Sequence, residues 1–191
     1  MSAIGRDHIV RPGRKSDVRR VAQALQKAVE PTEKGQIELI DAYEVRSEKL
    51  SLDYGVVSYN EVVRSGRSVS HSVGVGHLIV LALPCDLGRI WIRPEGLLDK
   101  LSEFVVSGDI DFAEHPRFSS RYLLHADDPE LLNRRVSAAF WQAFGEQRRL
   151  VAVGRGATLV IGKDGGLHSD DAADLVALGF RLLRAFGSPV S

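Results

Sequence analysis

The chain holds one cysteine, carries no net charge and lacks a long run of apolar residues. Cys85 has no second cysteine to pair with, so nothing in the sequence indicates an oxidising compartment. Lysine and arginine together number 25, as do aspartate and glutamate, and a neutral protein lacks the long-range field that attracts nucleic acid. The longest apolar run, His77–Pro84, is far too short to cross a bilayer, and Met1 is followed by polar residues instead of an apolar signal segment. We therefore expect a cytoplasmic protein that does not bind nucleic acid.

The length of 191 residues suits one domain, because folding at this size buries roughly 70% of the surface of the unfolded chain. Residues 1–15 contain glycine, arginine and proline without periodicity, which predicts a mobile tail. Residues 16–34 are predicted to hold a basic amphipathic helix that starts after Ser16 and ends at Pro31. Residues 36–187 are expected to form a single α+β domain.

The first half of this domain has the pattern of an antiparallel sheet with short connections. Alternating apolar and polar residues predict half-buried strands at Ile37–Leu39, Leu50–Tyr54 and Val56–Val63. Leu78–Leu83 is continuously apolar, which is typical of a strand buried on both faces. A short helix is predicted to begin at Pro94.

The last third predicts a strand at Phe118–His125 and then a helix, a hairpin and a second helix. Asp128 has the position of an N-cap, Pro129 follows as the first helical residue, and the helix is expected to continue to residue 145. Strands around Gly154-Arg155-Gly156 form the predicted hairpin, and a last helix is expected over residues 170–186. Strands and helices come in blocks, so we predict an α+β fold of antiparallel sheet and packed helices, with a helix-hairpin-helix C-terminal third.

Titratable side chains gather between residues 109 and 128. They are Asp109, Asp111, Glu114, His115, His125, Asp127 and Asp128. Carboxylates and imidazoles bind divalent metals or transfer protons, but their spacing here matches no metal motif. We select His115, Arg117, His125 and Asp127 as candidate binding residues, and we predict neither a metal nor a cofactor.

Two glycine pairs and one cysteine admit both a functional and a structural interpretation. Gly74-Val75-Gly76 and Gly154-Arg155-Gly156 are followed by strand-like sequence, so we interpret both as hairpin turns and not as phosphate-binding loops. Cys85 lacks the flanking signature of a nucleophile, although His71 or His77 could supply a base. We interpret it as a structural thiol.

Trp91 and Arg93 stand where a strand is expected to meet a helix. Such a pair can make a cation–π contact or bind an anion. A packed Trp91 with Arg93 paired to Glu95 is the more ordinary arrangement, and we expect it here.

Four segments, Trp91–Leu98, Asp109–Phe112, His115–Leu124 and Asp127–Glu130, resemble soluble domains of uncharacterised bacterial proteins. In that family a leucine-arginine-proline-glutamate segment precedes a histidine-proline-x-phenylalanine-serine segment and a long helix. The resemblance covers about residues 40–186. The family's domain often follows membrane spans, which this sequence does not show, and it has no established activity. The resemblance therefore implies a bacterial protein and supplies no catalytic residue.

The sequence favours a non-enzymatic module that binds a partner protein or a second copy of itself, because the core is well patterned and no catalytic set converges. The alternative is a small metal-assisted, hydrolase-like enzyme in which His115, His125 and Asp127 meet in one pocket. Peripheral membrane contact through the basic residues of the segment 6–34 is a third interpretation, which the neutral net charge disfavours.

Overall fold

The computed structural model describes residues 9–12, 19, 37–47, 49–65, 68–95, 114–163 and 169–187. Its strands are β1 (Ile9–Pro12), β2 (Ile37–Ser47), β3 (Leu50–Ser65), β4 (Ser68–Ala82), β5 (Arg89–Pro94), β6 (Tyr122–Ala126), β7 (Leu150–Arg155) and β8 (Thr158–Lys163). Its helices are α2 (Pro116–Ser119), α3 (Pro129–Arg135), α4 (Ala138–Gly145) and α5 (Ser169–Gly187). Apart from Arg19, the helix predicted within residues 16–34 lies outside the described residues, and so does the helix predicted after Pro94. Within the predicted tail, Ile9–Pro12 pair with β2 as an edge strand.

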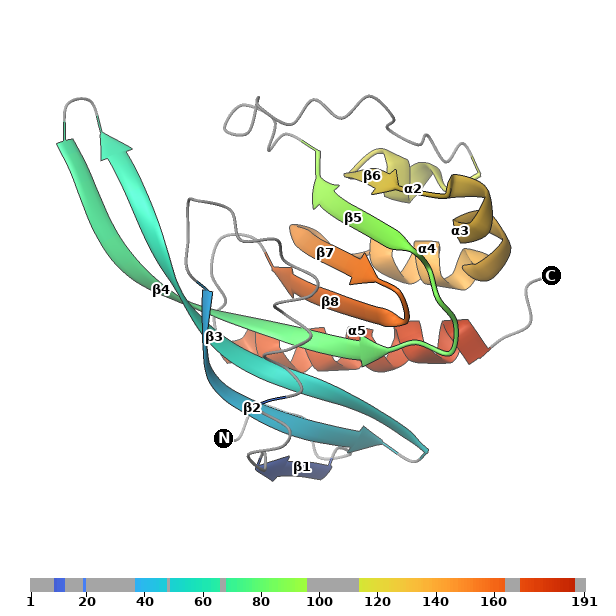
Figure 1. Cartoon of the computed structure of the whole chain (residues 1–191), viewed down its shortest axis with the longest axis horizontal. Helices are drawn as coiled ribbons and strands as arrows, with labels where there is room; N and C mark the ends of the chain where they lie inside the picture. The colour runs from blue at the N-terminus through green and yellow to red at the C-terminus, as the bar shows by residue number, and fades with distance from the viewer. Residues whose placement is uncertain are drawn as a thin grey trace.

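The strands form one eight-stranded antiparallel sheet in the order β1-β2-β3-β4-β8-β7-β5-β6 (Figure 1). The sheet and its helices confirm the predicted α+β class. The two strands predicted at Leu50–Tyr54 and Val56–Val63 are a single strand, β3, which pairs with β4 from Asp53 to Ser65. The outer part of this long hairpin, which we call the arm (residues 60–65 and 68–73), projects beyond the sheet in Figure 1.

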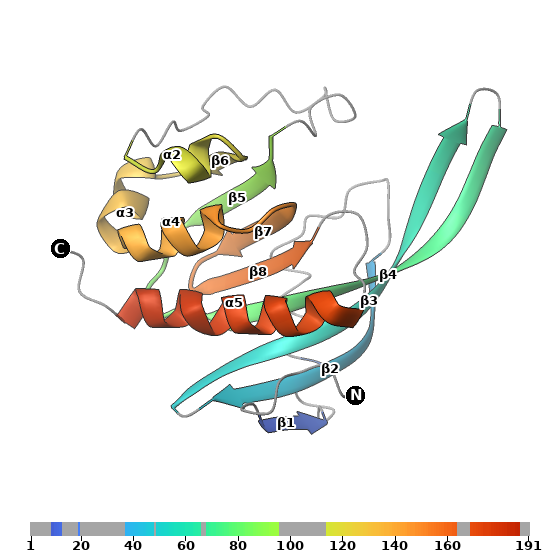
Figure 2. The same ribbon diagram turned by 180° about the vertical axis from the view of Figure 1, so that it is seen from behind.

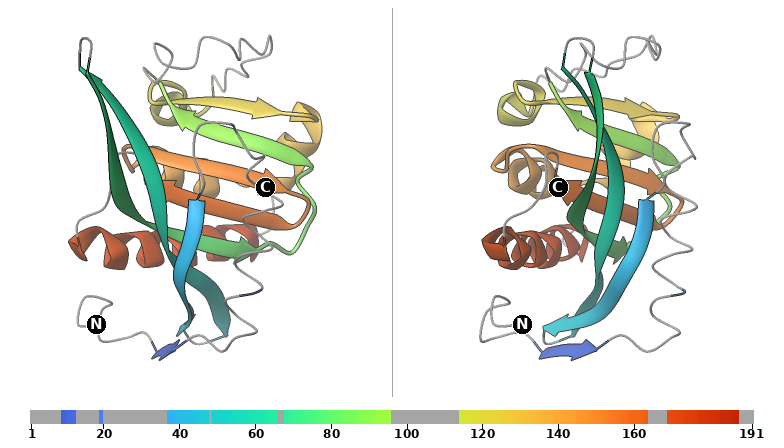
Figure 3. Two further views of the ribbon diagram at one scale, coloured as in Figure 1. Left: turned by 60° about the vertical axis from the view of Figure 1, so that its left-hand side comes forward. Right: turned by 90° about the vertical axis from the view of Figure 1, so that its left-hand side faces the viewer.

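Helices α2, α4 and α5 cover one face of the sheet, as Figure 2 shows from the helical side and Figure 3 in profile. Helix α5 crosses β3 and β4 and buries Leu175, Leu178 and Leu182, as the apolar spacing predicted. A Cβ atom on Gly179 would lie 2.7 Å from Cδ2 of Leu52 and 2.8 Å from Cδ1 of Ile79. Glycine at this position therefore lets α5 lie close against the sheet.

Aromatic side chains fill the core between α2, β6 and α4. They are Phe118, Tyr122, Phe140, Trp141 and Phe144, and each is at most 3% exposed. The Phe118 ring lies 4.8 Å from that of Trp141 and 5.9 Å from that of Phe144, with edge-to-face tilts that aromatic pairs favour. The Tyr122 hydroxyl donates to the Gln147 carbonyl at 3.1 Å, so the polar end of this buried ring is satisfied.

The single helix expected from Asp128 to residue 145 is two helices, and that prediction was wrong. Asp128 does cap α3, since its carboxylate accepts the Leu131 N–H at 2.8 Å. The chain then becomes extended at Val136 and Ser137 before α4 begins. Ser137 is buried, and its hydroxyl donates to the Ala185 carbonyl in α5 at 2.9 Å. This tertiary hydrogen bond gives the break a structural role.

Three further boundaries differ from the sequence-based prediction. Phe118 lies in the short helix α2, and the strand begins only at Tyr122. Gly74-Val75-Gly76 lies within β4, where Gly76 pairs with Val57, and not in a turn. Pro94 is the last residue of β5, opposite Tyr122, so it belongs to a strand. The β5–β7 register ends at Ile92, so the missing N–H of Pro94 leaves that ladder intact.

The face of the sheet opposite the helices carries a smaller apolar cluster. It contains Ala42, Val57, Leu78, Val80 and Val160, with Leu39 and Val153 packed against it. Leu78–Leu81 is thus buried on both faces, as its continuous apolar run predicted. None of the helices in the described part of the chain is long and apolar enough to cross a membrane.

Candidate functional site

The two candidate histidines lie on opposite faces of the sheet. In β6, Leu124 and Ala126 point into the helix-covered core, so His125 between them points to the other face. His115 precedes α2 on the helical side, where its ring centroid lies 6.3 Å from that of the buried Trp141. The structure therefore does not bring the two imidazoles into one pocket, and the arrangement required by the hydrolase interpretation is not formed by these residues.

The other two candidate residues are also separated. Asp127 is exposed after β6, and its backbone N–H donates to the Arg89 carbonyl at 3.1 Å. Arg117 is exposed on α2. Among the residues that the structure describes, no group of three or more His, Cys, Asp or Glu side chains is placed to hold a metal ion. Asp109 and Asp111 lie outside these residues.

Trp91, Arg93 and His125 form a cluster on the sheet face opposite the helices. Trp91 and Arg93 alternate with the buried Ile90 and Ile92 along β5, so they project from that face. Trp91 is the direct cross-strand partner of His125, which places both side chains on the same face. The guanidinium carbon of Arg93 lies 5.2 Å from the centroid of the Trp91 ring, a cation–π contact.

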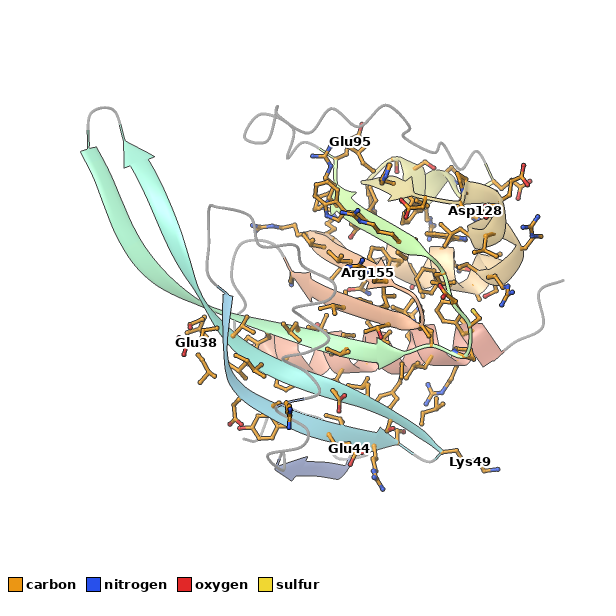
Figure 4. All side chains as sticks on the ribbon, in the orientation of Figure 1. Glu38, Glu44, Lys49, Glu95, Asp128 and Arg155 are labelled. Atoms are coloured by element: carbon orange, nitrogen blue, oxygen red, sulfur yellow. The ribbon has the colours of Figure 1, made fainter. Side chains whose placement is uncertain are left out.

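Two nitrogens of this cluster are buried without a hydrogen-bond partner. They are Nη1 of Arg93 and Nδ1 of His125. The ion pair expected between Arg93 and Glu95 is not formed, although the structure describes both residues, and Glu95 is exposed at the end of β5 (Figure 4). An unsatisfied buried donor costs about 1–3 kcal/mol, and more when it is charged. The cluster is therefore an unusual concentration of unused hydrogen-bonding capacity.

No family model, curated protein or solved structure matches the chain. The resemblance to a bacterial domain family therefore stays a prediction.

A shallow groove of about 330 Å³ runs between α4 and α5 on the outer side of the helical layer. It is lined by Ala139, Gln142, Ala143, Arg181, Arg184 and Ala185. The small alanine side chains form the floor of the groove between the two helices. The two arginines and the glutamine are exposed at its rim. The groove thus combines a small apolar floor with a cationic rim.

Glu146, at the C-terminal end of α4, shows how this rim holds a carboxylate. Its Oε2 accepts a hydrogen bond from Nη2 of Arg181 at 2.6 Å. The hydrogen bond and charge of Arg181 lower the pKa of the Glu146 carboxyl, and the more distant charge of Arg117 lowers it further. Positive charge from α2 and α5 therefore converges beside α4, where Arg148 and Arg149 follow as exposed residues.

Cys85 has no catalytic surroundings in the described structure. Its thiol is free and partly buried, and its side chain packs against the main core. His77, which sequence reasoning considered as its base, shares a hydrogen bond through Nδ1 with the hydroxyl of Tyr54. The structure thus gives His77 another partner, while the side chain of His71 is not among those described.

The sequence identified His125 as a candidate but paired it with the wrong neighbours. The strand spacing of Trp91 and Arg93 was enough to place both on one face, but only the β5–β6 register puts His125 beside them. The groove between α4 and α5 had no sequence signal, because it depends on how two helices separated by a hairpin pack together.

Proposed function

We propose that this chain is a cytoplasmic, non-enzymatic module that binds an acidic segment of a partner protein in the groove between α4 and α5. The single observation that supports this is the pairing of an alanine floor with the exposed Arg181 and Arg184. Helices α4 and α5, which line the groove, are the proposed binding element.

The positive charge of Arg181 and Arg184 indicates that the partner segment is acidic. The carboxylate of Glu146 already accepts a hydrogen bond from Arg181 within the chain, so the guanidinium is oriented to donate to a carboxylate at this surface. Arg184 is also exposed and lies three residues further along α5, close to one helical turn away. Glutamates on a partner helix are the groups that best match two arginines with this spacing.

The size of α4 limits the partner segment and its affinity. Its eight residues make it about 12 Å long, which suits a partner of two to three helical turns. An interface of this length falls below the standard size of stable complexes, so we expect a transient, micromolar interaction that salt weakens.

The test uses a fluorescent helical peptide that has one alanine stripe flanked by glutamates, and a second peptide in which lysines replace every glutamate. Fluorescence anisotropy with the full chain should show binding of the acidic peptide only. The affinity should fall by at least about tenfold between about 0.05 and about 0.3 M NaCl. Equal binding of both peptides would contradict a site selective for acidic partners.

Arg46 provides a matched control for charge reversal. It is exposed and paired with Glu44 at 2.9 Å, as Arg181 is paired with Glu146, but it lies on β2 away from the helices. Arg181→Glu should abolish binding of the acidic peptide, and Arg46→Glu should leave it unchanged. If the two variants lose affinity equally, the binding follows net charge and the groove is not the site.

A further inference from the structure

We propose that Trp91, Arg93 and His125 form a binding site for the anionic group of a small molecule, either a phosphate or a carboxylate. The site lies on the sheet face opposite the groove between α4 and α5, so it is independent of the proposed protein-binding function. Its two unpaired nitrogens come from the adjacent strands β5 and β6, so an oxyanion could be held from two sides.

The two unpaired nitrogens indicate that an acceptor is missing from the cluster. Nη1 of Arg93 and Nδ1 of His125 are shielded from solvent and have no hydrogen-bond partner. Arginine is always charged at neutral pH, so its buried N–H can be satisfied only by an acceptor. An oxyanion supplies both that acceptor and the compensating charge, and a second oxygen can accept from Nδ1 of His125 when that nitrogen carries the ring proton.

The Trp91 ring fixes where the guanidinium lies. The guanidinium carbon is 5.2 Å from the ring centroid, so the Arg93 side chain lies over Trp91. Trp91 is the cross-strand partner of His125, so this conformation directs Arg93 towards the Trp91–His125 pair. Trp91, Arg93 and His125 each keep part of their surface exposed, although the two nitrogens themselves do not. Because both nitrogens are shielded from solvent, we expect anion binding to shift side chains of the cluster, and a shift of Arg93 would change the surroundings of the Trp91 ring.

The experiment titrates the full chain with inorganic phosphate and, separately, with succinate, in a zwitterionic buffer without chloride. Calorimetry measures affinity. Tryptophan fluorescence reports on Trp91 and Trp141 together, and a Trp91→Phe variant identifies the part of the change that comes from Trp91. We expect saturable binding of at least one of the two anions with a Kd of about 1 mM or tighter, together with a fluorescence change. Which of the two binds more tightly decides between a phosphate and a carboxylate ligand.

Arg93→Met removes the charge and keeps much of the side-chain volume. We expect it to weaken anion binding at least about tenfold and to abolish the fluorescence change. Arg89→Met is the matched control, since Arg89 projects from the same face of the same strand, and it should change the affinity less than about twofold. Equal losses in the two variants, or no saturable binding of either anion, would overturn the proposal.

A second readout guards against a variant that merely fails to fold. Without added anion, Arg93→Met should melt within about 4 °C of the wild type, because removal of a buried donor that has no partner offsets the loss of the cation–π contact with Trp91. Phosphate or succinate should then raise the melting temperature of the wild type only. If Arg93→Met melts well below the wild type in anion-free buffer, Arg93 already has a partner in the folded protein and the inference is wrong.

Discussion

The close approach of α5 to the sheet at Gly179 makes a prediction in which two physical effects oppose each other. Gly179→Ala improves the helix propensity of α5, which by itself would stabilise the protein by about 1 kcal/mol. The new Cβ atom, however, would lie 2.7 Å from Cδ2 of Leu52 and 2.8 Å from Cδ1 of Ile79, closer than Cβ contacts in proteins. Overpacking of this kind costs about 1–3 kcal/mol.

The net effect of Gly179→Ala should therefore be a destabilisation of about 0–2 kcal/mol instead of a gain. For a domain of this length, 1 kcal/mol corresponds to a melting-temperature change of about 2–4 °C. Ala177→Gly supplies the matched control, because Ala177 is exposed on the same helix and its substitution measures propensity alone, at a cost of about 1 kcal/mol. Denaturant unfolding of both variants gives the two free energies.

A double-mutant cycle then isolates the contact. Ile79→Val deletes the Cδ1 atom that the new Cβ meets, and alone it should cost about 0.5–1.5 kcal/mol. Combined with Gly179→Ala, it should cost at least about 0.5 kcal/mol less than the sum of the two single changes. A Gly179→Ala protein about 1 kcal/mol more stable than wild type, with additive behaviour in the cycle, would refute the close approach.

Three other predictions each concern one residue of the described structure. Asp128→Ala should destabilise the protein by about 0.5–2 kcal/mol, because it removes the N-cap acceptor of the Leu131 N–H, whereas Asp128→Asn should retain most of the stability in the same urea titration. Phe118→Ala should cost about 3–5 kcal/mol by thermal or denaturant unfolding, since Phe118 is 1% exposed and central to the aromatic core; a loss below about 1 kcal/mol would mean that this core is poorly packed. Burial, more than the nearby Tyr43, raises the pKa of Tyr54 to about 12 from 10.0, so the neutral phenol is favoured in the folded state. The stability that this provides is complete below pH 10 and is lost as the pH rises towards 12, and stability curves measured against pH should show a smaller alkaline loss for Tyr54→Phe than for wild type.

Local sequence signals predicted those elements whose boundaries depend on neighbouring residues. Asp128 and Pro129 gave the start of α3, and Gly156, with its φ of 62°, stands in the predicted hairpin between β7 and β8. The apolar run at Leu78–Leu83 indicated a strand buried on both faces, which the structure shows for Leu78–Leu81, whereas Ala82 is exposed and ends β4.

Boundaries and sites set by tertiary contacts were not predictable in this way. The break at Ser137 depends on a carbonyl in α5, which is 48 residues away in the sequence. Phe118 has the apolar character of a strand residue, but packing against Trp141 places it in a helical turn. His115 and His125 are near each other in sequence, yet the sheet separates them because side chains alternate along β6.

Strand β4 has two parts that differ in local stability, because its N-terminal part lies in the arm and its C-terminal part lies in the core of the sheet. The β2–β3 register ends at Tyr59 and the β4–β8 register begins at Leu78, so within the described sheet residues 60–65 and 68–73 pair only with each other. An isolated two-stranded ribbon is marginally stable in water, and its amide hydrogens exchange by local opening. Those of Ile79 and Leu81 in the same β4 exchange only when the core beneath α5 unfolds. Deuterium should therefore enter β4 from its N-terminal end and stop where the strand meets β8.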